Sequence, residues 1–365
     1  MDESGRNKYS VLTEYLRNEI LSGSIKPGDR IWSENKLVEM FGVSRHTVRR
    51  ALEILERDGY VEAIHGKGTF CSDRLIHMKK TKNIGVITTY ISDYIFPRLI
   101  QGMDRVFSEN GYTIILKNTG NSRKKEAEAL DVLLAKGIDG VIIEPSKSQL
   151  LCRHTDLYQR MEQSGIPYIF IQGCYEQMPD KPHIVMDDCQ GAYMVTHYLI
   201  ELGHRHIAGV FKADDIQGKE RHKGYVKALQ EAGFPYNPDM VVWFHTEDRK
   251  KKPAVMIGKM AEQGVELDGV VCYNDQIAIQ VMDALSELGM KVPEDVSVTG
   301  YDNSLIGQER GVGLTTIAHP QEKLGEMAAQ LLLEKLKNVP EENSRIPRLI
   351  APELIIRGSC ISRGK

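Results

Sequence analysis

The chain has 365 residues, 47 Lys and Arg against 50 Asp and Glu, a formal net charge of −3 at pH 7, and 41% hydrophobic residues. This length predicts two or three domains with sizeable cores, and no apolar run is long enough to cross a membrane. The N-terminus lacks the apolar core of a secretory signal, and the six cysteines form no Cys-x-x-Cys pair. We therefore expect a reduced, cytoplasmic protein without a disulfide framework or a zinc ribbon.

The charge is distributed unevenly along the chain. Residues 1–82 hold 15 Lys and Arg against 12 Asp and Glu, a net charge of +3, whereas the remaining 283 residues carry a net charge of −6. A small basic segment attached to a larger acidic one is typical of a nucleic-acid-binding module joined to another domain. The excess is small, so this interpretation needs a motif.

Residues 1–70 have the pattern of a small α+β winged helix-turn-helix domain. Apolar residues at helical spacing predict a first helix that ends near Leu21. A second helix is expected to begin after Ser33 and to end at Gly42, and a third to begin after Ser44, with each serine as the N-cap. On the third helix apolar residues recur at i, i+3, i+4 and i+7, which leaves the opposite face polar.

The polar face of the third helix carries the side chains expected to read DNA. Arg45 and Arg49 lie one turn apart near its N-terminal end, where a recognition helix approaches the base edges, and His46 lies further round the same face. Two β-prone runs then flank the turn HGKG and predict a wing, in which His65 and Lys67 can reach phosphate or the minor groove. Alternatively, an arginine-rich helix face is simply solvated, and the glycines of the turn serve its geometry alone.

The stretch from PGDR to GTF resembles the GntR-type DNA-binding domain. The resemblance rests on the pair Ser33-Glu34, on GVSRHTVRRAL and on the closing GKGTF. It implies that Arg45 and Arg49 read guanines, that Glu34 positions the second helix on DNA, and that a lysine before the first tyrosine contacts phosphate. The predicted DNA-binding residues are Lys8, Ser33, Glu34, Ser44, Arg45, His46, Thr47, Arg49, His65, Gly66 and Lys67.

A linker and a different kind of domain follow. Residues 71–82 are polar and basic without a periodic apolar face, which predicts a linker. From 83 to 365, apolar β-branched runs alternate with amphipathic helical stretches, a rhythm that predicts parallel sheets covered by helices on both faces. AKGIDGVIIEP (135–145) and EQGVELDGVVCYN (262–274) echo each other. The echo suggests two α/β halves with a cleft between them, and ligands of such sheets bind beyond the carboxyl ends of the strands.

Catalytic motifs are missing from the sequence of this body. It has no phosphate-binding P-loop, no G-x-G-x-x-G after its first strand, no H-E-x-x-H and no G-x-S-x-G. Its one closely spaced histidine pair, His204 and His206, is expected to have a satisfied surface role. We therefore expect a binding protein, not an enzyme, with no catalytic residues, no metal and no cofactor beyond a small-molecule effector.

Residues at the expected strand ends suggest a polar ligand such as a sugar. A sugar offers vicinal hydroxyls to planar polar groups and an apolar ring face to an aromatic side chain. Any one of these residues could be an ordinary turn or helix cap, but a set that occupies every expected strand end favours a site. The predicted ligand-binding residues are Asp93, Tyr94, Phe96, Glu144, Gln172, Arg221, Asn274 and Asp302.

The body resembles the LacI/GalR-type effector domains and the periplasmic sugar-binding proteins. The matching stretches are DYIFPRLIQGM, DDCQGAY, ERHKGYVKAL, YNDQIAIQVMDAL, VSVTGYDN and LTTIAHP. The resemblance implies a two-lobed, type I periplasmic-binding-protein-like fold in which Phe96 stacks on the ligand ring. It implies that Arg221 grips the ligand, together with Asn274 and the Asp302 carboxylate. Two departures are Gln172, where many sugar-binding members have Asp, and DYIF in place of NPFF.

A GntR-type head on a LacI/GalR-type body is similar to the arabinose repressor family, and ITTYISDYIFP, GVFKADDIQG and PELIIR carry this resemblance. The resemblance implies L-arabinose as the effector, whereas the residues alone indicate a small polyol or pentose. It implies a homodimer whose heads bind an inverted-repeat operator and leave it when the sugar binds between the lobes. Two alternatives stay open. One is a regulator that responds to another pentose, a nucleoside, a phosphosugar or a partner protein; the other is an enzyme-like body, such as a pyridoxal-phosphate domain, with a regulatory head.

Overall fold

The computed structural model divides the chain into two compact units, which are considered separately. One unit comprises residues 1–82 and 158–166, and the other comprises 83–157 and 167–365. The structure describes residues 8–21, 24–57, 59–64, 66–72, 81–91, 95–309, 313–340, 343–344 and 346–364.

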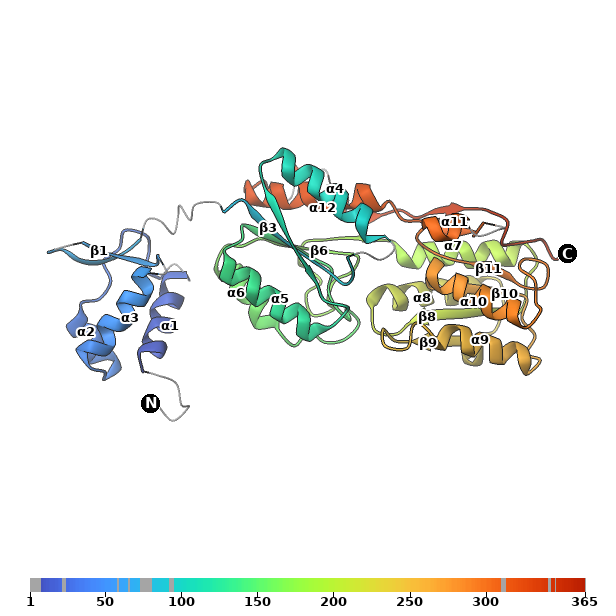
Figure 1. Ribbon diagram of the computed structural model, residues 1–365, viewed down its shortest axis with the longest axis horizontal. Coiled ribbons are helices and arrows are strands. Elements are labelled where there is room, and N and C mark those ends of the chain that lie inside the picture. Colours follow the sequence, from blue (N-terminus) through green and yellow to red (C-terminus); the bar gives the residue numbers. More distant parts are fainter. Residues whose placement is uncertain are drawn as a thin grey trace. The chain divides into compact units, whose positions relative to one another are not determined.

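The described residues of the N-terminal part of the chain form three helices and a two-stranded antiparallel hairpin (Figure 1). The elements are α1 (Lys8–Leu21), α2 (Glu34–Phe41), α3 (Arg45–Arg57), β1 (Val61–Ile64) and β2 (Gly68–Cys71). The predicted winged helix-turn-helix fold is confirmed, with the hairpin as its wing.

Local hydrogen bonds explain where the helices of this head begin and end. Ser33 Oγ accepts a hydrogen bond from the Lys36 N–H at 3.3 Å, and α2 ends at Gly42, whose φ of 59° is left-handed. Ser44 Oγ accepts from the Thr47 N–H at 3.2 Å, so both predicted serine caps are confirmed. The apolar stripe of α3 faces the core of the head and consists of Val48, Ala51, Leu52 and Leu55.

The second unit has two lobes, each built on a parallel sheet with helices on both faces (Figure 1). The sheet of the first lobe has the strand order β13-β7-β6-β5-β3-β4. Its strands are β3 (Asn83–Thr88), β4 (Thr113–Asn118), β5 (Gly140–Ile143), β6 (Tyr168–Ile171), β7 (His183–Met186) and β13 (Leu349–Ile350). The helices of this part of the chain are α4 (Phe96–Glu109), α5 (Arg123–Lys136), α6 (Thr155–Gln163) and α12 (Gln321–Leu336).

The second lobe repeats this architecture with a smaller parallel sheet of order β11-β10-β8-β9. Its strands are β8 (Ile207–Lys212), β9 (Val241–Phe244), β10 (Gly269–Cys272) and β11 (Ser297–Thr299), and a separate antiparallel ribbon pairs β12 (Thr316–Ala318) with β14 (Glu353–Ile355). Its helices are α7 (Asp188–Glu201), α8 (Ile216–Glu231), α9 (Lys252–Glu262), α10 (Asp275–Glu287), the short α11 (Leu305–Glu309) and the 3₁₀ turn η2 (Pro238–Met240). The predicted two-lobed α/β fold is confirmed.

The chain passes between the lobes more than once. It enters the second lobe after β7, returns after β12 to form α12 and β13, and then crosses again to β14. The returning helix packs closely: a Cβ on Gly102 of α4 would lie 2.1 Å from the carbonyl oxygen of Glu322, and one on Gly325 of α12 would lie 2.1 Å from that of Leu99. Only glycine allows α4 and α12 to approach backbone to backbone in this way.

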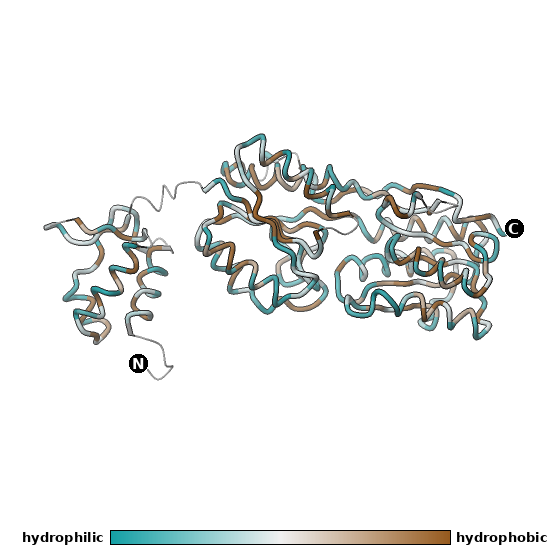
Figure 2. Tube along the Cα trace, in the orientation of Figure 1, coloured by the Kyte–Doolittle hydropathy of each residue, from teal (hydrophilic) through white to brown (hydrophobic). Residues whose placement is uncertain are grey.

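The hydrophobic residues gather in the interior of each lobe, along the inner strands, while the outer faces of the helices are more polar (Figure 2). In the first lobe the core joins β3, β5 and β6 to α4 and α12. No helix within the described ranges is long and apolar enough to span a bilayer.

Candidate functional site

The recognition helix α3 presents its predicted side chains to solvent. Arg45 and His46 are exposed in its first turn, and Arg49 follows one turn later. The Arg49 Nε donates to both carboxylate oxygens of Glu34, at 3.1 and 3.0 Å. These side chains are 64% and 38% exposed, so water screens the pair and its stabilising effect is small. The pair therefore holds the guanidinium on the outer face of the helix, and neither Nη atom makes a hydrogen bond to another described residue.

The Glu34–Arg49 contact joins α2 to α3 and was not expected from the sequence, which gave Glu34 a role on DNA alone. Thr47 is half-buried, with its hydroxyl 2.9 Å from that of Ser44. Gly66 and Lys67 are exposed in the wing. The predicted contact His65 and the side chain of Lys8 lie outside the described part of the chain. The use of all these residues in DNA binding stays a prediction.

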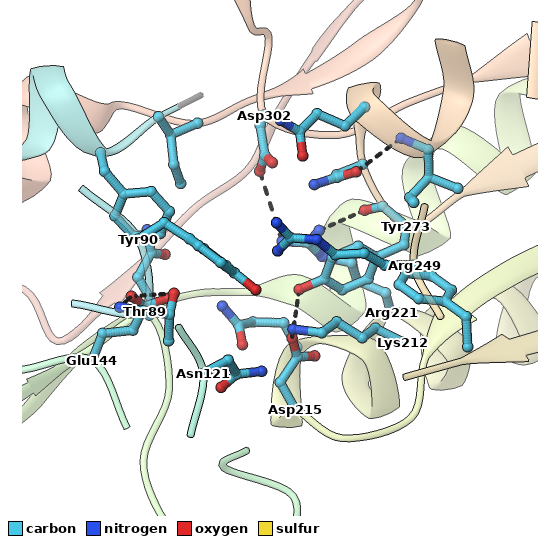
Figure 3. A pocket seen from close by; sticks show the side chains of 18 of the residues that line it. Thr89, Tyr90, Asn121, Glu144, Lys212, Asp215, Arg221, Arg249, Tyr273 and Asp302 are labelled. Carbon is cyan, nitrogen blue, oxygen red and sulfur yellow. Dashed lines mark hydrogen bonds and ion pairs between the residues drawn. The ribbon is translucent and has the colours of Figure 1, made fainter. Parts of the chain in front are cut away.

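A cavity lies between the two lobes of the second unit, beyond the carboxyl ends of their strands (Figure 3). It leaves about 90 Å³ open to the centres of water molecules. Since one water needs roughly 10–15 Å³ by this measure, the cavity holds several waters, the scale of one small ligand. Among its lining residues are the six predicted ligand-binding residues that the structure describes: Phe96, Glu144, Gln172, Arg221, Asn274 and Asp302. Asp93 and Tyr94 lie outside the described residues.

Arg221 is the most heavily bonded of the six. It lies on α8, not directly at a strand end, and its Nε donates to Asp188 at 2.8 Å while its Nη1 donates to the Tyr273 carbonyl at 2.6 Å. The guanidinium packs 3.6 Å from the Tyr301 ring centre, and its Nη2 lies 3.9 Å from Asp302. Burial opposes its charge, but Asp188 and Asp302 raise the pKa of Arg221 well above its usual value, so the side chain stays cationic.

A second buried cation, Lys212, lines the cavity at the end of β8. The Lys212 ammonium is buried 2.9 Å from Asp215, and the Tyr273 hydroxyl donates to the same Asp215 oxygen at 2.7 Å (Figure 3). Burial works against the charge on Lys212, but Asp215 and Asp214 raise its pKa. Burial also raises the pKa of Tyr273, which therefore keeps its proton and acts as a donor. These groups lock one another into fixed orientations.

Glu144, just after β5, is poised to exchange a proton near neutral pH. It accepts hydrogen bonds from the N–H and the hydroxyl of Thr89, at 2.6 and 2.7 Å. Burial raises the pKa of Glu144 to about 7, although both bonds from Thr89 act in the opposite direction. Its carboxyl group can accordingly serve either as a donor or as an acceptor toward a ligand hydroxyl.

Two buried donors in the cavity have no partner among the described residues. The Gln172 side-chain oxygen accepts from His319 Nε2 at 2.9 Å, but the Gln172 amide nitrogen and the Tyr90 hydroxyl are buried without a hydrogen bond. Gln172 and Asp302 also adopt positive φ angles, of 65° and 99°. Unsatisfied donors and left-handed backbone at non-glycine residues are both costly and concentrate where a ligand binds.

Asn274 is both a helix cap and a cavity-lining residue, the two interpretations that the sequence left open. Its side-chain oxygen caps α10 by accepting from the Ile277 N–H at 3.1 Å, and the residue also lines the cavity. The expectation for His204 was wrong: the ring is fully buried and its Nε2 donates to the Ile361 carbonyl at 3.1 Å, because the C-terminal segment covers it. Its neighbour His206 is half-exposed, as expected.

Several lining residues were not identified from the sequence. Arg249 lies in the loop before α9, and its guanidinium packs 4.2 Å from the Tyr90 ring centre. Lys212 is the last residue of the strand IAGVFK and Asp215 follows shortly after, so the strand-end rule applied to β8 would have found both. Arg249 had no such signal, because the fold of its loop alone brings it to the cavity. The polar and aromatic lining residues missed are Thr89, Tyr90, Asn121, Lys212, Asp215, Gln217, Phe244, Arg249, Tyr273 and Gln276.

Two family models match the chain in the positions that the fold suggests. Residues 8–71 match the bacterial regulatory proteins of the gntR family, and residues 196–360 match a periplasmic binding protein-like domain. A winged helix-turn-helix head and a two-lobed body with a cavity between its lobes define a DNA-binding transcription regulator with a sugar-binding type of effector domain.

Relatives specify the class further. The arabinose metabolism transcriptional repressor of Halalkalibacterium halodurans is 38% identical over 96% of this chain and 96% of its own length. The repressor of the same name from Geobacillus stearothermophilus is 36% identical over 98% of this chain and 99% of its own. A LacI family transcriptional regulator from Enterococcus faecium, solved with bound ribose, is 27% identical over 77% of this chain and all of its own, with a TM-score of 0.66.

The chain belongs to the family of the arabinose metabolism transcriptional repressors, which join a gntR-type head to a periplasmic-binding-protein-like body. It is therefore a transcriptional repressor of sugar metabolism.

Proposed function

We propose that this protein represses genes for arabinose use by binding an inverted-repeat operator as a homodimer, and that it leaves the operator when L-arabinose occupies the cavity between its lobes. The observation that carries the proposal is the cavity itself, where planar polar groups from both lobes converge in a chain 38% identical to a named arabinose repressor. The proposal needs no metal and no cofactor.

The charges of the cavity favour a neutral polyol over a phosphosugar. Its lining has three cationic side chains, Lys212, Arg221 and Arg249, and three carboxyl groups, which belong to Glu144, Asp215 and Asp302. The first two cations are already bonded to carboxylates, at 2.9 and 2.8 Å. A phosphate would need cations without such partners, whereas ring hydroxyls can both donate to the carboxylates and accept from the cations and amides.

The head would read DNA through a few specific contacts. Arg45 and Arg49 project from the exposed face of α3, and each guanidinium can bond a guanine edge with two N–H groups. The net charge of residues 1–82 is only +3, so bulk electrostatic attraction contributes little. Two linked heads on two half-sites compensate for this, since the second head binds at a high effective concentration.

Release requires the sugar to favour an arrangement that binds DNA poorly. A ligand shifts such an equilibrium only by its difference in affinity for the two states. A coupling free energy of about 1–3 kcal/mol corresponds to roughly 5- to 150-fold in operator affinity. Lining residues from both lobes support this mechanism, because a ligand that contacts both lobes binds best at one separation between them.

Operator affinity measured by fluorescence anisotropy tests the proposal. L-arabinose is expected to raise the operator Kd at least about fivefold, and D-arabinose, which has the same composition and opposite stereochemistry, is the matched control. A ribose-type pentose is the second candidate, because a LacI family relative was solved with bound ribose. Release by D-ribose alone would transfer the assignment to that sugar, and release by no pentose would refute induction through this cavity.

A further inference from the structure

A second cavity opens at the N-terminal end of α5, and its lining has a different charge from that of the sugar cavity. It leaves about 510 Å³ open to water centres. Five basic side chains line it against one acid; these six residues are Arg123, Lys124, Lys147, Arg153, His154 and Glu247. The lining of the sugar cavity has three cations and three carboxyl groups. The second cavity differs because basic side chains outnumber acidic ones in its lining.

The histidine of this set is held in its charged form. His154 Nε2 lies 2.8 Å from an oxygen of Glu126, a fully buried carboxylate that also accepts from the Tyr175 hydroxyl at 2.9 Å. Burial disfavours the charged ring, but the contacts with Cys152 and Glu126 raise the pKa of His154 to about 9. The imidazolium therefore keeps its charge at neutral pH, and the buried Glu126 carboxylate beside it balances that charge.

The arginines of the cavity are positioned without being neutralised. Arg123 Nη1 donates to the uncharged Leu151 carbonyl at 2.6 Å, and Arg153 is exposed and forms no ion pair with any described residue. Lys124 has only a weak pairing with Glu128, at 3.8 Å, with the lysine side chain 86% exposed. The first N–H groups of α5 have no acceptor within the helix, and they add further partial positive charge beside these side chains.

The cavity also borders the contacts that join the two lobes. Lys147, from the first lobe, places its Nζ 2.5 Å from Glu247 and 3.4 Å from Asp214, both from the second lobe. Beside it, the Asn121 side-chain N–H donates to the Thr246 hydroxyl at 2.6 Å, again from one lobe to the other. Asn121 lines both cavities, so a movement of its side chain changes the lining of the second cavity and of the sugar cavity together.

We propose that the cavity at the start of α5 binds a small dianion, of the class of a phosphate group or a phosphorylated metabolite, which competes with Glu247 for Lys147. An anion at this position attracts Arg123, Lys124 and Arg153, which have no carboxylate closer than 3.8 Å among the described residues, and it repels the Glu247 carboxylate. It thereby weakens a contact between the lobes and lowers the affinity of the sugar cavity for its ligand. The binding site stands on its own observations, whereas the effect on sugar affinity rests on the proposed function.

Calorimetric titration of the intact protein with inorganic phosphate, in a phosphate-free buffer of constant ionic strength, tests the site. Saturable binding is expected, and the double variant Lys124→Gln with Arg153→Gln should weaken it at least about tenfold, since two cationic side chains that can bond the anion are lost. The matched control is Lys136→Gln, which removes an exposed lysine from the last turn of the same helix.

Glu247→Gln supplies a test of opposite sign. It removes the competing carboxylate and should tighten phosphate binding severalfold, and unchanged melting temperatures would show that all variants remain folded. The proposal is overturned if the wild-type protein shows no saturable binding. It is also overturned if Lys136→Gln weakens binding as much as the double variant, because phosphate would then be binding through the overall charge of the protein or to the DNA-binding head, not in this cavity.

The coupling is measured by titrating L-arabinose with and without saturating phosphate. An affinity about fivefold weaker with phosphate is expected, with a reciprocal effect of the sugar on phosphate. Phosphate that binds at the cavity but leaves sugar affinity unchanged would overturn the competition for Lys147. If L-arabinose does not bind at all, the proposed function fails, while the phosphate titrations of the variants still decide the second site.

Discussion

Replacement of Glu144 by glutamine should stabilise the protein, and by an amount that grows with pH. The carboxyl group is buried, and one of its oxygens accepts both hydrogen bonds from Thr89. A glutamine side-chain oxygen can accept the same two bonds, so Glu144→Gln removes the charge and keeps the local geometry. What changes is the proton equilibrium of this one group.

The magnitude follows from the raised pKa of Glu144, which is about 7 in the folded protein because of burial, against an ordinary value of 4.5. Below pH 4.5 the group is protonated in both the folded and the unfolded chain. Between 4.5 and 7 only the unfolded chain loses its proton, so the free energy of unfolding falls as the pH rises, and the loss is complete above 7. At about 1.36 kcal/mol per pKa unit, the wild-type protein loses roughly 3 kcal/mol.

Thermal melts of the wild-type protein and of Glu144→Gln without sugar, at pH 5.5 and pH 8, provide the measurement. Because 1 kcal/mol shifts the midpoint by roughly 2 °C in a domain of this size, the advantage of the variant should increase by about 4 °C between the two pH values. Other carboxyl groups titrate equally in both proteins and cancel in the difference. A difference that does not change with pH would show that Glu144 is already ionised in the fold, and the reasoning from burial would be wrong.

Three further substitutions test the head, the cavity and the packing. Arg49→Ala should abolish specific operator binding in a gel-shift assay and leave the L-arabinose affinity unchanged; a loss of sugar affinity would refute this division of roles. Arg221→Met leaves the buried Asp188 without its partner, so we expect the protein to lose about 3–5 kcal/mol of stability and also its sugar binding. Thermal melting measures the first effect and calorimetry the second; full sugar affinity in the variant would contradict the prediction. Gly224→Ala places a Cβ 2.0 Å from a carbonyl oxygen of α7 and should lower the melting temperature by several degrees, whereas Gly258→Ala, whose Cβ meets no atom closer than 4.0 Å, should not.

The head could be predicted in detail because its determinants are local. The serines that cap α2 and α3 and the left-handed Gly42 act over three or four residues, so sequence spacing alone locates the helix ends. The pair formed by Glu34 and Arg49 was missed because it spans 15 residues and depends on the angle between two helices. A charged side chain on a polar helix face looks solvated in the sequence whether or not it has such a partner.

The cavity could be predicted only in part, for a related reason. The carboxyl ends of parallel strands meet at one edge of a sheet, and this rule located Glu144, Gln172 and Asp302 without knowledge of the fold. A lysine at the end of a strand is ordinarily exposed, but Lys212 is buried beside Asp214 and Asp215 of the following loop, and Tyr273, which follows β10, donates to the same Asp215. This clustering of charged groups forms only when the chain folds, so no local sequence pattern predicts it.

The return of the chain to the first lobe has a consequence for the order of events during synthesis. Strand β7 ends at Met186, but its edge partner β13 ends only at Ile350, and α12, which covers the same sheet, lies between them. At about 5–20 residues per second, roughly 10–30 seconds separate the emergence of these two strands from the ribosome. During that interval the second lobe gains all four strands of its parallel sheet, the last of which ends at Thr299, while the first lobe still exposes the apolar surface that α12 will cover. The first lobe therefore gains its covering helix and its edge strand only after the parallel sheet of the second lobe is complete, and a nascent protein halted before α12 emerges would be a natural target for chaperones.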